Sequence, residues 1–134
     1  MVPMEGVSQV GAERPQLAVR VLDQQCPRAV FDRVTNRWAV LIFDALSDGP
    51  RRFSELTAEV SGISEKMLAQ NLRILVRAGL IERCVAPTVP PQVTYSLTTL
   101  GSDLTATLHL LVDWVDDHIE PMAQARDRYD AAAS

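Results

Sequence analysis

Cysteine and histidine are scarce in this chain, which holds two of each among its 134 residues. Cys26 and Cys84 are too few to form a disulfide scaffold. Neither cysteine stands at a zinc-type spacing from His109 or His118. We therefore expect no metal site and no cofactor, and we place both histidines on the surface or at an interface.

Long apolar runs and enzyme motifs are missing as well. No stretch approaches the roughly 20 apolar residues that cross a bilayer, and the N-terminus has no apolar signal core behind basic residues. No phosphate-binding glycine loop, nucleophile elbow or metal-binding motif occurs in the chain. The sequence thus predicts a cytoplasmic protein that is neither an enzyme nor bound to a membrane.

Basic residues are absent between Arg83 and Arg126. The formal charge is -4, but residues 1–83 hold 11 basic and 10 acidic side chains, whereas residues 84–134 hold 2 and 7. An acidic total argues at first sight against binding to nucleic acid. Because the acidic excess lies downstream, the first part of the chain can still present a locally positive surface.

The remaining composition is that of a globular protein, with 47% hydrophobic and 22% charged residues. A chain of this length fits one domain. We predict a mobile arm over residues 1–15, one domain over residues 16–122 that includes the dimerisation helices, and a C-terminal tail over residues 123–134.

The first part of this domain predicts three helices. A short helix over 16–23 stops before Cys26-Pro27, because a residue that precedes proline avoids the α region. Cys26 then caps a second helix, with Pro27 in its first position. The segment 37–46 is apolar on most sides and is the predicted buried central helix.

The second part of the domain predicts a helix-turn-helix with a wing. Ser54 and Ser64 are the predicted N-caps of two helices that a tight turn joins. Strands at 80–85 and 92–97 follow around a proline-rich loop, and Thr98 caps a long last helix. The predicted fold class is α+β, mainly α: a winged helix-turn-helix with an N-terminal helix and a long C-terminal dimerisation helix.

The second helix of the motif has two distinct faces at about 100° per residue. Lys66, Gln70, Arg73 and Arg77 form its polar face, and Leu68, Leu72 and Leu75 lie opposite. Gln70 can bond an adenine edge, and Arg73 and Lys66 can reach guanine or phosphate. Arg77, near the helix end, suits a phosphate. Ser54, Ser64 and Gln92 complete the predicted DNA-binding residues, and the alternative is a solvated helix face without a ligand.

The last helix carries an apolar stripe at spacings of 3 and 4, outside the helix-turn-helix. Such a stripe needs cover from another surface. Pairing with the same stripe of a second chain, together with the first helix, predicts a homodimer. The expected interface consists of Leu17, Val21, Leu104, Leu108, Leu111 and Val115.

Several short motifs follow one another along the chain: Cys26-Pro27, Asn36-Arg37-Trp38, Asp48-Gly49-Pro50, Arg52-Phe53-Ser54-Glu55-Leu56, Gly62-Ile63-Ser64-Glu65-Lys66-Met67-Leu68, Ala78-Gly79-Leu80-Ile81 and the wing from Val89-Pro90-Pro91 to Gly101. In this order they resemble the HxlR family of bacterial regulators. The resemblance covers about residues 26–115 and implies a MarR-like dimer that binds operator DNA, usually as a repressor. The chain has Asn71 where the family commonly has an arginine, and Gln92 where the wing often has a basic residue.

Cys26 is a second candidate site. At a helix N-cap, amide N–H groups and the helix dipole stabilise a thiolate, and Arg28 adds positive charge nearby. Some members of the resembled family sense oxidants, quinones or aldehydes through a cysteine here, which implies a small-molecule or electrophile inducer. The alternative is a packed thiol with no sensing role. Cys84, on a strand, is expected in the core.

The residues and the resemblance together predict a homodimeric transcription regulator, a repressor that binds a near-palindromic operator in double-stranded DNA. A small-molecule or thiol-reactive signal would release it. The rival function is a winged-helix module that binds proteins and no longer binds DNA, which the acidic total and the uncharged wing favour. The polar face of the helix at 65–78 favours DNA.

Overall fold

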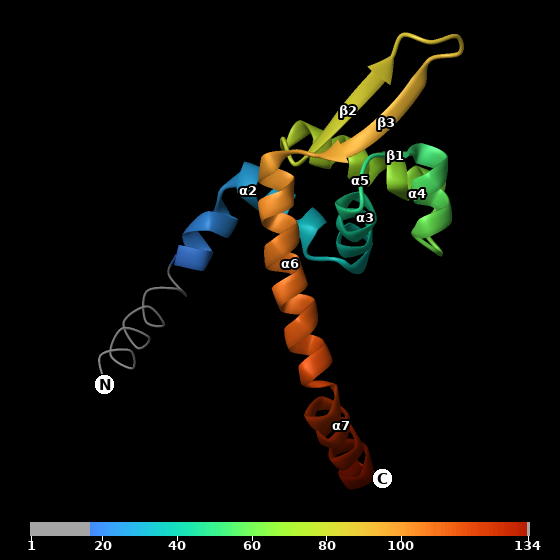
Figure 1. Cartoon of the computed structure of the whole chain (residues 1–134). Coiled ribbons are helices and arrows are strands. Elements are labelled where there is room, and N and C mark those ends of the chain that lie inside the picture. The colour runs from blue at the N-terminus through green and yellow to red at the C-terminus, as the bar shows by residue number, and fades with distance from the viewer. Residues whose placement is uncertain (1–16, 134) are drawn as a thin grey trace.

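The computed structural model describes residues 17–133, apart from the side chains of Cys26 and Pro27, so the arm predicted over residues 1–15 lies outside the described residues (Figure 1). Residues 17–23 are helical. The elements that follow are α2 (Gln25–Val34), α3 (Arg37–Ser47), β1 (Arg51–Arg52), α4 (Phe53–Glu59), α5 (Glu65–Arg77), β2 (Ile81–Ala86), β3 (Gln92–Leu97), α6 (Thr99–Asp117) and α7 (Ile119–Ala133). The predicted winged helix-turn-helix, mainly α with a small sheet, is confirmed.

Helix α2 begins earlier than the sequence predicted. Its N-cap residue is Gln24, which is extended and whose carbonyl oxygen accepts a hydrogen bond from the Arg28 amide at 3.1 Å. The prediction that Cys26 is the N-cap is therefore wrong. Pro27 is tolerated inside the first turn because amide groups there have no partner within the helix.

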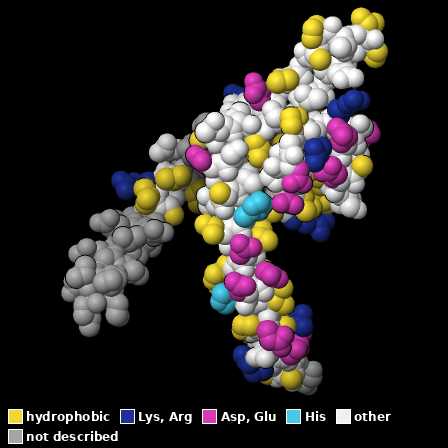
Figure 2. Space-filling model, in the orientation of Figure 1, with side chains coloured by type: hydrophobic (Ala, Val, Ile, Leu, Met, Phe, Trp, Pro, Cys, Tyr) yellow, Lys and Arg dark blue, Asp and Glu magenta, His cyan; other side chains and the backbone are white. Residues whose placement is uncertain are grey.

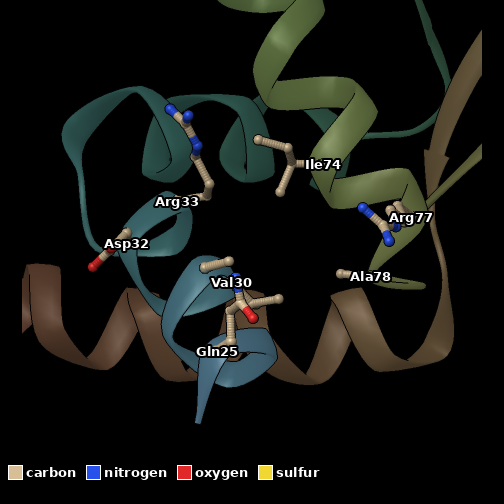
Figure 3. A pocket seen from close by; sticks show the side chains of 8 residues that line it. Gln25, Val30, Asp32, Arg33, Ile74, Arg77 and Ala78 are labelled. Carbon is tan, nitrogen blue, oxygen red and sulfur yellow. The ribbon is translucent and has the colours of Figure 1, made fainter. Parts of the chain in front are cut away.

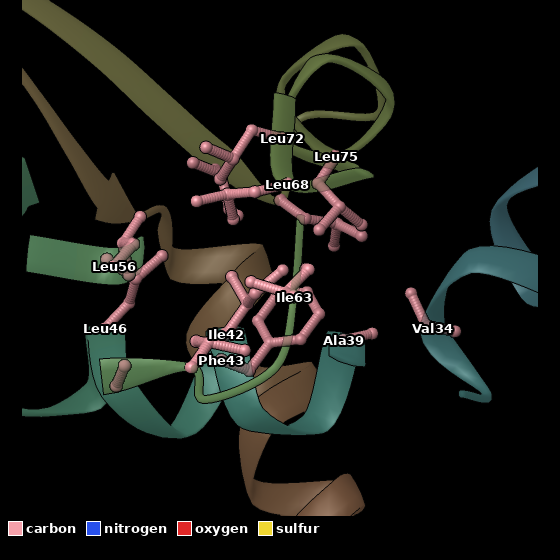
Figure 4. Packing of buried hydrophobic residues seen from close by; sticks show 14 of the residues in the cluster. Val34, Ala39, Ile42, Phe43, Leu46, Leu56, Ile63, Leu68, Leu72 and Leu75 are labelled. Carbon is pink, nitrogen blue, oxygen red and sulfur yellow. The ribbon is translucent and has the colours of Figure 1, made fainter. Parts of the chain in front are cut away.

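The core forms around α3, as predicted. Asn36 caps this helix by accepting a hydrogen bond from the Ala39 amide at 3.0 Å. The buried side chains of α3 face those of α4, α5 and the turn between them (Figure 4): Ala39, Ile42, Phe43 and Leu46 on one side, and Leu56, Ile63, Leu68, Leu72 and Leu75 on the other. This packing holds the helix-turn-helix against the central helix.

The sheet has three antiparallel strands in the order β1-β3-β2, and its two long strands form the wing. Cys84 of β2 pairs with Thr94 of β3, while the neighbouring Tyr95 packs against the core. Since successive residues of a strand point to opposite faces, Cys84 faces away from the core, and it is exposed. The prediction that Cys84 lies in the core is wrong, because no described element covers that face.

The predicted last helix is divided in two. Helix α6 ends at Asp117, and α7 runs through the residues predicted as a C-terminal tail. In the first half of α6, Leu104 packs against the core and Leu108 is only 6% exposed. These two predicted interface residues are thus covered largely by their own chain, whereas Leu100 at the start of α6 is exposed. Leu111 and Val115 lie beyond the body of the domain and are exposed.

Both histidines, His109 in α6 and His118 at the C-cap of α6, have partners within the chain. His109 Nε2 lies 3.1 Å from Asp44 Oδ1 and so links α6 to α3. The His118 ring stacks on Trp114 with 4.1 Å between ring centroids. Within residues 17–133 no group of three His, Cys, Asp or Glu side chains is placed to hold a metal ion. No helix in this described part is long and apolar enough to cross a membrane.

Candidate nucleic-acid interface

A tight turn positions α5. Gly62 in this turn has a φ of +90°, in the left-handed region that favours glycine, and the buried Ile63 beside it anchors the turn to the core. Ser64 then caps α5 as predicted, its Oγ accepting a hydrogen bond from the Met67 amide at 3.0 Å. The direction in which α5 leaves the core is thereby fixed.

Ser54 does not cap the preceding helix. Helix α4 already begins at Phe53, and its start is held by Glu55, whose Oε1 accepts a hydrogen bond from the Arg52 amide at 2.8 Å. The predicted cap is therefore wrong by two residues. Ser54 is nevertheless exposed in the first turn of α4.

The predicted polar face of α5 is present as an exposed surface. Lys66, Gln70, Arg73 and Arg77 are all exposed, and Leu68, Leu72 and Leu75 opposite them are at most 2% exposed. None of the three cations forms an ion pair with a described residue. Their charges are thus free to meet phosphate or base edges.

Asn71, where the resembled family commonly has an arginine, lies on the packed side of α5. It is 2% exposed, and its Nδ2 donates to the Met67 carbonyl at 2.8 Å. Its buried Oδ1 has no hydrogen-bond partner among the described residues. The difference from the resembled family at this position therefore leaves the polar face of α5 unchanged.

Two arginines beside the wing were missed by the sequence analysis. Arg52 of β1 pairs with Thr94 of β3, and Arg83 of β2 pairs with Tyr95, so an exposed arginine lies on each side of the central strand, and the two point to opposite faces of the sheet. Arg51, by contrast, forms an ion pair, with its Nε 2.9 Å from Glu59 Oε1. A strand of two residues has no periodicity in the sequence. The only local indication of charge beside the wing was therefore the pair of adjacent arginines after Pro50.

The tip of the wing, by contrast, carries no charge. No charged residue occurs from Cys84 to Ser102, and Figure 2 shows the tip with hydrophobic and uncharged side chains alone. The predicted contact residue Gln92 is exposed at the start of β3. Contacts from the tip are therefore limited to hydrogen bonds and shape, while charge is available at the base of the wing.

Comparison with known proteins agrees with this geometry. Residues 33–123 match the HxlR-like helix-turn-helix family. The HTH-type transcriptional regulator YtfH of Escherichia coli K12 is 41% identical over 122 residues, which cover 90% of this chain and 97% of that protein.

Solved structures show the same likeness. The transcriptional regulator YtfH from Salmonella typhimurium is 44% identical, with a TM-score of 0.68 over 75% of this chain and 89% of that one. The reduced form of the transcriptional regulator YodB from B. subtilis is 38% identical, with a TM-score of 0.63 over 73% of this chain and 96% of that one. A diamide-treated form of YodB is also among the similar structures, with a TM-score of 0.61, 37% identity and coverage of 70% and 93%.

The family match spans the central helix, the helix-turn-helix, the wing and α6. It includes every residue of the exposed polar face of α5 and both arginines at the base of the wing. The chain belongs to the HxlR-like helix-turn-helix family and is a transcriptional regulator of the helix-turn-helix type.

Proposed function

We propose that this regulator is a homodimeric repressor that binds a near-palindromic operator, with α5 of each chain in the major groove. The observation that carries the proposal is the polar face of α5, which is exposed and forms no ion pair with any described residue, while the opposite face is buried. A merely solvated face would be polar as well, but these four residues include three cations and no carboxylate. Gln70 and Arg73 contact base edges, and Arg77 contacts phosphate.

The arginines at the base of the wing extend this interface. Arg52 and Arg83 are exposed on the two outer strands of the sheet. They supply charged phosphate contacts, which the uncharged wing tip cannot make. The acidic helices α6 and α7 point away from the wing (Figure 1), so their charge is kept away from the DNA.

A mobility-shift titration over a range of salt concentrations tests the proposal. We expect the protein to bind the DNA upstream of its own gene more tightly than a scrambled duplex of the same length. The affinity should fall steeply as salt rises, because each phosphate contact releases counterions. Absence of binding to either duplex at low salt would favour the rival function of a protein-interaction module.

The exposed apolar surface supports the dimer. Large hydrophobic side chains are exposed on the helix at 17–23 and along the second half of α6 and α7: Leu17, Val19, Val21, Leu110, Leu111, Val112, Trp114, Val115, Ile119, Met122 and Tyr129. A surface of this size on a single chain is typical of a protein–protein interface. We assign it to a second copy of the chain, because two half-sites of an operator require two copies of α5.

Charges placed in this surface are expected to separate the dimer. The double variant Leu111→Glu/Val115→Glu should run as a monomer in light scattering, whereas Leu100→Glu, at an exposed leucine at the start of α6, should remain a dimer. Loss of the second half-site should weaken operator binding by roughly 10²- to 10⁴-fold. A wild-type protein that is monomeric at micromolar concentration and still binds its operator would contradict the dimer.

A thiol-reactive signal is the proposed route of release. The relative YodB has been solved both reduced and after treatment with diamide, a thiol oxidant. In this chain Cys26 belongs to α2, a helix that packs against α5, the predicted recognition helix. Diamide takes two hydrogen atoms from a pair of thiols and leaves a disulfide, so it would join Cys26 to the same cysteine of the second copy and constrain α2, and a shift of α2 can move α5.

Titration of the operator complex with diamide tests this route. We expect wild type and Cys84→Ser to lose the operator as diamide increases, and Cys26→Ser to retain it. Cys84 is the matched control, because it is exposed on the wing and open to the same reagent. Equal responses of wild type and Cys26→Ser would show that Cys26 is structural, and loss of the response in Cys84→Ser alone would place the signal in the wing.

A further inference from the structure

A groove of about 950 Å³ lies between α2 and α5 (Figure 3). Its size is at the upper end of the range of roughly 300 to 1,000 Å³ found for small-molecule sites. Ala29, Val30 and Arg33 of α2 form part of one side, and Ile74, Arg77 and the following Ala78 form the other. The groove thus joins the predicted recognition helix to the helix that carries Cys26.

The groove carries a net positive charge. The guanidinium groups of Arg33 and Arg77 belong to its lining, and neither forms an ion pair with a described residue. Asp32 is the one carboxylate in the lining. In Figure 3 its carboxylate lies on the far side of the groove from Arg77 and points outward, so it does not neutralise that cation.

The surface between these cations is apolar. Val30 lies on α2 and Ile74 on α5, and Figure 3 shows both side chains between Arg33 and Arg77, with Ala78 next to Arg77. An inorganic anion would use only the charges, whereas a ligand with an apolar body would also bury this surface. The lining therefore fits a molecule that combines both properties.

We propose that the groove between α2 and α5 binds a small organic anion, whose acidic group pairs with Arg77 and whose apolar body contacts Val30 and Ile74. The effect on transcription rests on the proposed function. Arg77 is also the predicted phosphate contact, so an anion in the groove withdraws this side chain from DNA. The groove is thereby an effector site that competes with the operator for one arginine.

Calorimetry in the absence of DNA tests the site with three probes: 2-naphthoate, its neutral analogue 2-naphthamide, and acetate, which has the charge without the apolar body. We expect 2-naphthoate to bind at least about tenfold more tightly than 2-naphthamide, since one charge-assisted interaction is worth about that factor. It should exceed acetate by at least the same factor, because acetate has no apolar body to bury against Val30 and Ile74. Each variant is first checked for cooperative thermal unfolding, so that a misfolded protein is not taken for one that cannot bind.

Four variants locate the binding. Arg77→Gln should weaken 2-naphthoate binding about tenfold or more, and Ala29→Leu should block it by filling the groove. Asp32→Asn should strengthen it, because a like charge is removed. Arg126→Gln, in α7, is the matched control and should change nothing. No binding of 2-naphthoate to wild type, or binding that is insensitive to both Arg77→Gln and Ala29→Leu, overturns the proposal.

The competition with DNA is tested separately. Saturating 2-naphthoate should weaken operator binding of wild type about as much as Arg77→Gln does, and it should have no further effect on the Arg77→Gln protein. If 2-naphthoate binds the groove but the protein binds no DNA, the proposed function fails and the site stands. If the groove is instead covered by a second chain, 2-naphthoate will bind only the monomeric Leu111→Glu/Val115→Glu variant, and the proposal for the native protein fails.

Discussion

Arg73→Ala and Gln70→Ala are expected to remove most of the preference of the protein for its operator over random duplex DNA. Both side chains are exposed on the polar face of α5. Each lost base contact should cost about 1 to 3 kcal/mol of binding to the operator. Binding to random DNA should change far less for Gln70→Ala, because a neutral side chain contributes little to phosphate attraction.

Arg77→Ala is expected to act differently, because its partner is a phosphate. It should weaken binding to operator and to random DNA alike and reduce the salt dependence by about one counterion. Fluorescence anisotropy with both duplexes at several salt concentrations separates the two classes, and Arg128→Ala in α7 is the matched control. If Arg73→Ala and Gln70→Ala bind both duplexes as wild type does, the polar face of α5 does not contact the bases of the operator.

Gly101→Ala is expected to cost the fold about 3 kcal/mol or more. Gly101 is buried in the first turn of α6, and a Cβ atom there would lie 2.0 Å from the Leu80 carbonyl oxygen and 3.0 Å from its carbon. Both atoms are backbone, so no side chain can turn aside. Thr98 binds on both sides of this contact, donating to the Gly79 carbonyl at 2.6 Å and accepting from the Gly101 amide at 3.0 Å.

Gly79→Ala provides the comparison, because its cost has another origin. Gly79 has a φ of +79°, but a Cβ atom there would meet nothing within 4 Å. The loss should therefore be the conformational penalty alone, about 1 to 2 kcal/mol. Urea unfolding of the two variants and wild type measures both values. A Gly101→Ala protein as stable as Gly79→Ala would show that α6 can move away from Leu80 at little cost.

The features predicted correctly from sequence are those fixed by neighbours along the chain. The two faces of α5 follow from the helical repeat, and the caps at Ser64 and Thr98 each bond an amide three residues ahead. These signals are local, so the sequence contains them directly. The winged helix-turn-helix could be predicted because its order of elements depends on such signals.

Two local predictions failed as well, since the helix starts expected at Cys26 and Ser54 are each capped two residues earlier. The other features that were missed depend on contacts between distant segments. The pairing of Arg52 with Thr94 joins residues 42 positions apart, and the sequence has no local mark of it. Cys84 is exposed because nothing described covers its face of the wing, and Leu108 is buried because α3 lies against α6. The groove between α2 and α5 is likewise a product of tertiary packing.

The central claim, that α5 enters the major groove of operator DNA, is tested most directly by affinity cleavage. An iron–EDTA group is attached at position 66 of a Lys66→Cys protein that also carries Cys26→Ser and Cys84→Ser, and an otherwise identical protein carries it at position 128 in place of Arg128. We predict that the probe on α5 cuts the operator at two clusters separated by about one helical turn, roughly 10 base pairs, and that the probe on α7 does not cut. Uncut DNA with the probe on α5, or equal cleavage from α7, would contradict the account.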